Sequence, residues 1–238
     1  MTALFISDLH LDPKRPGSID DFERFVAERA LRAERVYVLG DLFEAWIGDD
    51  DDEPELARVL HALARLGDAG VPCAVMHGNR DFLIGERFAR ATGCRLLGDY
   101  ELVEVHGARV LLTHGDLLCT DDVRYLELRS RLRDPLWQRD FLAKPLRERR
   151  EIAAALRQLS ATEMAEKPEQ IMDVNQDTVE RVMREHGVEW LLHGHTHRPA
   201  IHRFTLDGRP AMRIVLGAWY ESPAIAWWDA AGPRLETL

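Results

Sequence analysis

The chain has 238 residues and a formal net charge of −10, with 46% hydrophobic and 30% charged residues. This length and composition indicate a globular protein, most simply one α/β domain that carries an insertion. The acidic balance argues against general nucleic-acid binding, which requires a basic surface.

The sequence contains no run of about 18 apolar residues, so we expect no membrane-spanning segment. The opening "MTALFISDLH" has no basic segment and too short an apolar run for a secretory signal. Cys73, Cys94 and Cys119 are odd in number and widely spaced, which argues against a disulfide framework or a thiolate zinc site. We therefore expect a soluble or peripheral protein of the reducing cytoplasm.

In chain order, five short apolar runs are predicted to be strands, at 3–7, 35–40, 73–78, 108–113 and 189–194. A helix is predicted between the second and third, where Leu56, Val59, Leu60 and Leu63 have the spacing of one helix face. Alternation of strands and helices predicts an α/β sheet that is buried on both faces. Such sheets bind ligands beyond the carboxyl ends of their strands.

Each of the five predicted strands is followed by a carboxylate, an imidazole or an amide. These candidate ligands are Asp8, His10, Asp41, Asn79, His114, His195 and His197. Seven oxygen and nitrogen ligands are more than one catalytic ion takes, so we expect two divalent ions bridged by Asp41. Ligands without sulfur suit Mn²⁺, Fe²⁺ or Zn²⁺. The six remaining histidines, at 61, 77, 106, 186, 193 and 202, are assigned no ligand role.

The motifs "DLH", "GDLFEAW", "GNRDF", "THGD" and "GHTH", in this order and spacing, resemble those of the calcineurin-like metallophosphoesterases. The resemblance implies a four-layer α/β/β/α sandwich and two bound ions, most simply Mn²⁺. It implies that one ion is held by Asp8, His10, Asp41 and His197, and the other by Asp41, Asn79, His114 and His195.

Together with "ISDLHL", "HGNRDFLIG" and "HGHTHRP", these motifs are most similar to the UDP-2,3-diacylglucosamine hydrolase family of lipid A biosynthesis. This family implies that metal-activated water attacks the α-phosphorus of UDP-2,3-diacylglucosamine, giving UMP and 2,3-diacylglucosamine 1-phosphate (lipid X). It also implies a peripheral protein at the cytoplasmic face of the inner membrane, and no protein partner is evident. The alternatives are a phosphodiesterase or phosphatase of soluble nucleotides, or a non-catalytic scaffold.

Arg80 follows Asn79 where the wider superfamily usually has a histidine that protonates the leaving group. Arginine is not a general acid near neutral pH. A departing phosphate monoester needs little protonation, because its second pKa is near 6. We therefore predict that Arg80 is a catalytic phosphate clamp that acts beside Asp41 and Asn79, and that Asp81 orients its neighbours.

The segment 120–187 is predicted to be a helical insertion within the single domain of residues 1–238, with helix N-caps at Thr120 and Asp173. Its apolar side chains, including Leu156, are expected to line an acyl-chain groove or to form the insertion's own core. The resemblance implies substrate contacts at Asn79, Arg80, Asp122, Tyr125, Arg157, Ser160, Met164, Lys167 and His195. Met164 departs from the polar residue of the relatives.

Residues 124–157 carry ten Lys and Arg against five Asp and Glu, a charge of +5 in an otherwise acidic chain. This segment is expected to be a site for an anion or a solvated helix face. Arg149 and Arg150 are predicted to strengthen association with anionic bilayers. The acidic run 49–53 is expected to be a solvated loop.

Overall fold

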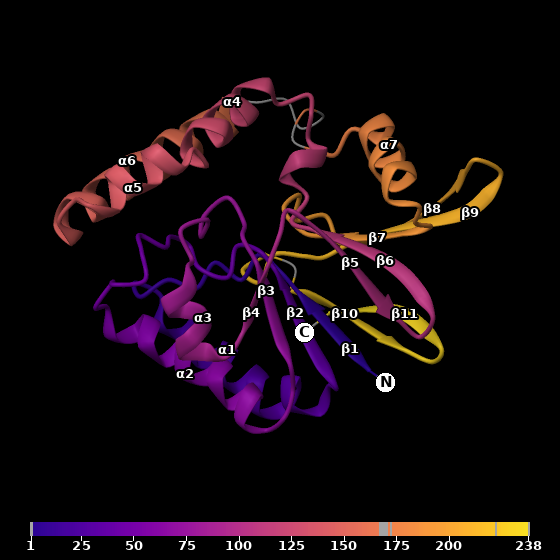
Figure 1. Ribbon diagram of the computed structural model, residues 1–238, viewed down its shortest axis with the longest axis horizontal. Coiled ribbons are helices and arrows are strands. Elements are labelled where there is room, and N and C mark those ends of the chain that lie inside the picture. The colour runs from indigo at the N-terminus through magenta and orange to yellow at the C-terminus, as the bar shows by residue number, and fades with distance from the viewer. Residues whose placement is uncertain (1, 167–170, 172, 222, 238) are drawn as a thin grey trace.

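The computed structural model describes residues 2–166, 171, 173–221 and 223–237, without the side chains of 161–166 (Figure 1). The first sheet has the strand order β11-β10-β1-β2-β3-β4. Its strands are β1 (Ala3–Ile6), β2 (Arg35–Leu39), β3 (Cys73–Met76), β4 (Arg95–Leu97), β10 (Ala224–Asp229) and β11 (Gly232–Thr237). Strands β1 to β4 are parallel, so β1, β2 and β3 end at one edge of the sheet.

The second sheet has the order β5-β6-β7-β9-β8. Its strands are β5 (Tyr100–Val105), β6 (Ala108–Thr113), β7 (Trp190–His193), β8 (Ala200–Leu206) and β9 (Arg209–Val215). Strands β6, β7 and β9 are parallel. The two sheets pack through a buried apolar layer that includes Phe5, Leu39, Leu112 and Leu192.

Helices cover the outer face of each sheet. Helices α1 (Pro16–Glu28), α2 (Pro54–Asp68) and α3 (Glu86–Thr92) pack on the first sheet, and α7 (Gln176–His186) packs on the second. Helix α2 buries Leu56, Val59 and Leu63, the face that the sequence spacing predicts. The four-layer α/β/β/α sandwich that the family resemblance implies is confirmed. The single sheet predicted from the alternation of strands and helices was wrong, because the five predicted strands divide between two sheets.

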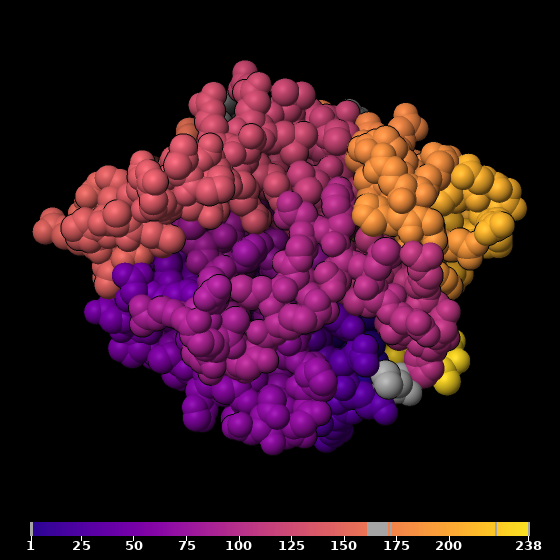
Figure 2. All heavy atoms as spheres, viewed as in Figure 1, coloured from indigo at the N-terminus to yellow at the C-terminus, as the bar shows by residue number. Residues whose placement is uncertain are grey.

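Three further helices lie between β6 and α7: α4 (Val123–Leu132), α5 (Pro135–Leu142) and α6 (Leu146–Glu166). We call them the helical cap. Figure 1 shows them on the side where β1, β2 and β3 end, and in the space-filling view the cap overhangs the N-terminal layer (Figure 2). No helix in the described part of the chain has the length and apolar character needed to cross a membrane.

Two of the predicted helix N-caps were wrong. Asp122, not Thr120, caps α4, because its carboxylate accepts a hydrogen bond from the backbone N–H of Tyr125. Asn175, not Asp173, caps α7 by accepting from the backbone N–H of Thr178. In each case the chain stays non-helical for two further residues.

Candidate active site

The seven predicted metal ligands come together where strands of both sheets end. Asp8, Asp41 and Asn79 follow β1, β2 and β3 in the first sheet, and His114, His195 and His197 follow β6 and β7 in the second. Five of the seven have a left-handed backbone conformation, with φ values of 55° (Asp8), 48° (His10), 51° (Asp41), 67° (His195) and 55° (His197). This conformation costs a non-glycine residue about 1–2 kcal/mol, and such strain concentrates at functional sites.

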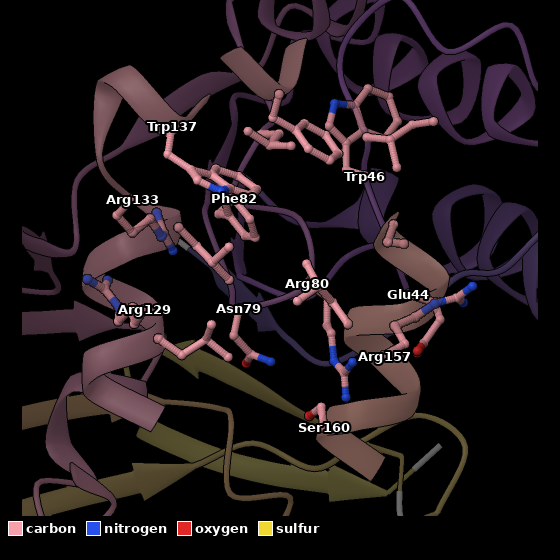
Figure 3. Close-up of a pocket in the computed structure, with 18 of the residues that line it drawn as sticks. Glu44, Trp46, Asn79, Arg80, Phe82, Arg129, Arg133, Trp137, Arg157 and Ser160 are labelled. Carbon is pink, nitrogen blue, oxygen red and sulfur yellow. The ribbon is translucent and has the colours of Figure 1, made fainter. Parts of the chain in front are cut away.

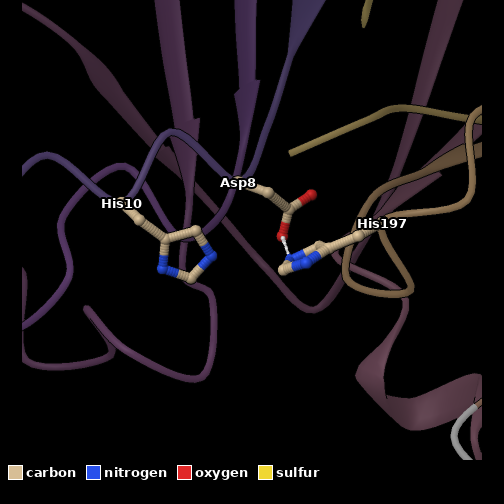
Figure 4. A group of neighbouring side chains, drawn as sticks. All are labelled: Asp8, His10 and His197. Atoms are coloured by element: carbon tan, nitrogen blue, oxygen red, sulfur yellow. Dashed lines mark ion pairs between the residues drawn. The ribbon is translucent and has the colours of Figure 1, made fainter. Parts of the chain in front are cut away.

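Asp8, His10 and His197 form the first of two clusters (Figure 4). His197 Nε2 lies 3.4 Å from Asp8 Oδ1, and His10 Nε2 lies 3.6 Å from Asp41 Oδ2. The other oxygen of Asp8 accepts from the Ser7 hydroxyl and from the backbone N–H of His195. Ser7 and the His195 backbone thus hold one carboxylate oxygen of Asp8, and the other oxygen faces the imidazoles of His10 and His197.

The second cluster comprises Asp8, Asp41 and His114, and Asn79 lies beside it. His114 Nε2 lies 3.9 Å from Asp41 Oδ2, the same oxygen that faces His10. Asn79 Oδ1 lies 2.9 Å from His114 Nε2 and 3.0 Å from His195 Nδ1. Asp41 Oδ2 therefore faces one imidazole of each cluster. The amide oxygen of Asn79 lies within hydrogen-bond distance of the His114 and His195 imidazoles.

The side chains fit divalent cations. Asp8 Oδ1 and His10 Nε2 are buried and have no hydrogen-bond partner among the described residues, so both atoms are available to a ligand inside the cluster. Although burial opposes ionisation, the nearby imidazoles of His197, His114 and His10 lower the pKa of Asp8. Burial, with the neighbouring His114, lowers the pKa of His195 to about 4, so this imidazole is neutral at pH 7 and able to bind a metal.

Two glycines allow the ligand loops to approach one another. A Cβ atom on Gly78 would lie 2.0 Å from Asp41 Oδ1, and one on Gly194 would lie 2.2 Å from Asp8 Oδ2. Buried Asp81 joins two of these loops, because its carboxylate accepts from the backbone N–H groups of Leu42 and Gly78 at 2.7 Å each. Burial and the neighbouring Asp41 raise the pKa of Asp81 to about 6, against the hydrogen bonds that it accepts.

Arg80 lies where two cavities meet. Its backbone N–H donates to Asp41 Oδ1 at 2.8 Å, which fixes the residue beside the ligands. One cavity, mostly apolar, runs under the cap past Trp46, Phe82, Trp137, Phe141 and Leu156. The second, more polar and of about 310 Å³, extends over His195 and His197. Figure 3 shows Arg80 between Asn79 on one side and Glu44 and Arg157 on the other.

The described candidate substrate contacts all line these cavities. Asn79, Arg80, Tyr125 and Ser160 line both, Arg157 lines the apolar one, and Asp122 and His195 line the polar one. Lys167 lies outside the described residues, and the side chain of Met164 is likewise outside them.

The apolar cap residues do not form a separate core. Trp137, Leu146 and Ile152 pack against the core of the first sheet, which also contains the buried Phe141. Leu156 lines the apolar cavity, whereas Leu159 is 52% exposed. Of the two alternatives given above, the described cap residues do not fit an independent small core, because they pack on the sandwich.

The acidic loop is not simply solvated, and Arg149 is not a surface cation. Arg149 is 2% exposed; its guanidinium donates to both carboxylate oxygens of Asp50 and to the carbonyl of Ile47. Asp49 accepts from the indole of Trp46 and from backbone N–H groups of the α3 start. The acidic loop and the basic helix are thus partners, and they fasten α6 to the sandwich.

The sequence analysis missed four residues that support the site. Glu44 Oε2 lies 3.1 Å from His10 Nδ1, and Tyr220 Oη lies 3.2 Å from His197 Nδ1. Asp116 accepts from the Tyr125 hydroxyl and from Arg129, while Arg133 donates to the Gly78 carbonyl. Glu44 and Asp116 stand inside quoted motifs, which was a usable signal. Arg133 and Tyr220 have no local signal.

Comparisons with known proteins identify the family of the chain. The family model described as "Calcineurin-like phosphoesterase" matches residues 1–199. A protein of Serratia proteamaculans (strain 568) named UDP-2,3-diacylglucosamine hydrolase is 50% identical over 220 residues, which is 92% of each chain. One of the same name from Stenotrophomonas maltophilia (strain K279a) is 48% identical over 100% of this chain and 99% of its own. Among solved structures, an archaeal phosphodiesterase has a TM-score of 0.51 at 15% identity and covers 100% of both chains, a likeness of fold.

Proposed function

The chain belongs to the UDP-2,3-diacylglucosamine hydrolase family of the calcineurin-like phosphoesterases, and we propose that it hydrolyses the pyrophosphate bond of UDP-2,3-diacylglucosamine. The products would be UMP and 2,3-diacylglucosamine 1-phosphate, in lipid A biosynthesis. One observation carries the proposal: Arg80 and the metal-ligand clusters lie where an apolar cavity meets a polar one. A substrate with acyl chains on one side of its pyrophosphate and a nucleoside on the other suits this arrangement.

We propose two Mn²⁺ ions. Asp8, His10, Asp41 and His197 would hold one, and Asp41, Asn79, His114 and His195 the other. When bound, the ions would activate water and offset charge on the phosphate oxygens. The position of Asp41 Oδ2, within 4 Å of both His10 Nε2 and His114 Nε2, supports its role as the bridge.

Arg80 would bind the phosphates and stabilise the negative charge that develops in the transition state. Its Nε is buried without a hydrogen-bond partner in the described part of the chain, so the guanidinium has donor capacity left for a ligand. Its backbone is held by Asp41 on one side and, through its carbonyl, by the N–H of Trp46. A guanidinium placed in this way holds phosphate oxygens without donating a proton.

The apolar cavity would receive the acyl chains. The rings of Trp137 and Phe141 stack with their centroids 5.0 Å apart, and the ring centroid of Phe82 lies 6.2 Å from that of Trp137. Aromatic rings therefore form much of the cavity wall. Its volume of about 100 Å³ is below the roughly 300 Å³ at which ligand pockets begin. We therefore propose that the cap, comprising α4 to α6, moves outward when the lipid enters. Helix α7 lies within the predicted insertion 120–187, but it packs on the second sheet and is therefore not part of the cap.

We further propose that the cap rests on the cytoplasmic face of the inner membrane. Six large hydrophobic residues are exposed among those described, and four of them are on the cap: Val123, Leu136, Leu142 and Leu159. Exposed apolar side chains gathered on one element mark an interaction surface. Arg139 and Arg147, 70% and 91% exposed and paired with Asp140 and Glu151, are the exposed cations on this surface in place of the buried Arg149.

The test compares three substrates with purified protein and Mn²⁺: UDP-2,3-diacylglucosamine, deacylated UDP-glucosamine and a soluble phosphodiester. We expect UMP from the diacylated substrate and little turnover of the others, because binding energy from remote groups supports the chemistry. Leu156→Asp should impair the first reaction and retain the metals, whereas the control Leu102→Asp, on β5 and 43% exposed, should not. Equal turnover of all three substrates would favour a soluble-nucleotide hydrolase, and no turnover of any would favour a scaffold.

A further inference from the structure

Glu44 faces a metal ligand and the phosphate clamp at the same time. Its Oε2 lies 3.1 Å from His10 Nδ1, and its side chain lines the apolar cavity together with Arg80 and Arg157. Figure 3 shows Glu44 beside Arg157, at the end of the cavity where Arg80 extends. The residue stands three positions after Asp41, in the turn that leaves β2.

We infer that Glu44 is a positioning residue that commits His10 to metal binding through Nε2. A carboxylate can only accept from the imidazole, so Nδ1 carries the proton and the lone pair is left on Nε2. Nε2 is the nitrogen that is buried without a hydrogen-bond partner, and it points toward Asp41 Oδ2 at 3.6 Å. A carboxylate in this position orients the ring and raises its basicity as a ligand.

The backbone around Glu44 is built to hold this contact. The loop 8–11 runs beside the loop 41–44: His10 N–H donates to the Asp41 carbonyl at 3.0 Å, and Glu44 N–H donates to the Leu11 carbonyl at 3.0 Å. Leu11 and Phe43 also form a parallel bridge. His10 and Glu44 are thus fixed relative to each other by main-chain hydrogen bonds, as a contact that sets ligand geometry requires.

Two of the other predicted imidazole ligands have neutral outer partners. His114 Nδ1 faces the Leu39 carbonyl at 2.8 Å, and His197 Nδ1 faces the half-exposed Tyr220 hydroxyl at 3.2 Å. Glu44 differs because it brings a negative charge next to the ligand cluster. Removing Glu44 should therefore lower the affinity for the ion that His10 would bind more than the affinity for the ion at His114 and His195.

This inference rests on the proposed two-metal site. Its test is isothermal titration calorimetry, in which metal-free protein is titrated with MnCl₂ in the absence of substrate. We expect Glu44→Ala to weaken one of two Mn²⁺ sites by about 10- to 100-fold. Glu44→Gln should weaken it less, because the amide oxygen still accepts from Nδ1. The matched control is Glu23→Gln, a partner of Arg58 between α1 and α2, which should bind like the parent.

A double-mutant cycle separates positioning from simple stabilisation. In a His10→Ala background, Glu44→Ala should cause no further loss of Mn²⁺ affinity, because the ring that it orients is absent. Parental affinity in Glu44→Ala would overturn the inference, as would an equal loss with and without His10. If Glu44→Ala does not fold, parental affinity in Glu44→Gln would overturn it equally. A parent that binds two Mn²⁺ but does not cleave the lipid substrate would reject the proposed substrate alone.

Discussion

At the residue scale, the chemistry depends on side chains that are held before any ligand arrives. Asp8, Asp41 and His197 have left-handed backbone conformations, and Asp81 ties the Asp41 loop to the Asn79 loop. Pre-organised ligands and donors need little rearrangement when charge develops on a phosphate. The strain of these backbones is balanced by the surrounding sandwich.

Arg80→Ala is expected to lower turnover of the diacylated substrate by about 100-fold or more, the scale of removing one pre-organised donor. Metal content should stay at the parental value, because the contact with Asp41 uses the Arg80 backbone. Arg80→His should not restore full turnover, since proton donation is not what the leaving phosphate lacks. Full activity in Arg80→His would show that the leaving group does need a proton. Steady-state kinetics and metal analysis decide.

The left-handed conformation of His197 predicts a reversal of the usual glycine penalty. In metal-free protein, His197→Gly should be more stable than His197→Ala by about 1 kcal/mol, because glycine adopts a positive φ without strain. At the control His202, in the extended strand β8, the glycine variant should be the less stable one. Urea unfolding measures both pairs. The same order at the two positions would contradict the assigned backbone strain.

At the element scale, polar contacts tie the cap to the loops that carry the metal ligands. Arg133 of α4 donates to the Gly78 carbonyl next to Asn79, and Arg129 of α4 contacts Asp116, two residues after His114. Arg149 of α6 contacts the Ile47 carbonyl in the loop after β2. Movement of the cap is therefore expected to reach the metal-ligand loops directly.

Arg149→Met should destabilise the protein by about 2 kcal/mol, because it removes charge-assisted hydrogen bonds from a buried guanidinium and leaves the Ile47 carbonyl without this donor. The matched control Arg147→Met, whose side chain is 91% exposed and pairs with Glu151, should change stability by less than about 0.5 kcal/mol. Thermal unfolding measures the two variants. Equal effects would mean that the contacts of Arg149 with Asp50 and Ile47 contribute no more to stability than a surface ion pair.

The contact between Arg149 and Asp50 predicts that the stability of the fold depends on pH. Hydrogen bonds from Arg149 lower the pKa of Asp50, with a smaller opposing effect of desolvation. A carboxylate with a lowered pKa stabilises the fold above its unfolded value of about 4 and loses that contribution as the pH falls through its folded value. The stability gap between the parent and Asp50→Asn should thus be constant from about pH 7 to pH 5 and shrink below about pH 4. Urea midpoints across this range test it, and a gap that closes near pH 6 would contradict it.

At the scale of the whole molecule, charge is divided between the sandwich and the cap. Residues 124–157 carry ten basic and five acidic side chains within a chain of net charge −10. Many of these cations are paired, and the same segment carries the exposed apolar side chains Leu136 and Leu142. An acidic body with a basic and apolar cap favours one orientation at an anionic bilayer.

Leu136→Asp is therefore expected to weaken binding to anionic vesicles, and Arg147→Ala to weaken it by about 1 kcal/mol, an effect that fades with added salt. Leu102→Asp, on β5 in the second sheet, is the control for an exposed leucine away from the cap. Vesicle co-sedimentation gives the affinities. Equal losses for Leu136→Asp and Leu102→Asp would reject the cap as the membrane-facing surface.

The sequence alone determined the strands and the set of candidate ligands, and its motifs, through the family resemblance, implied the sandwich. The runs that lead to Asp8, Asp41, Asn79, His114 and His195 form the predicted strands β1, β2, β3, β6 and β7 within one or two residues. These signals are local: an apolar strand is followed by a glycine or a turn and then by a polar donor. Within each sheet, parallel strands bring their carboxyl ends to one edge, so the ligands of that sheet lie close together. The packing of the two sheets then brings the two ligand sets together.

Only the tertiary structure decided which partners those residues have. Arg149 and Ile47 are 102 positions apart, and neither the acidic run nor the basic helix indicates that they meet. Helix periodicity assigns Arg149 to a charged surface, whereas docking of α6 on the sandwich buries it. The same holds for Tyr220 at His197. Such contacts depend on how whole elements pack, and the free energy of that packing is spread over many residues, so no short stretch of sequence encodes it.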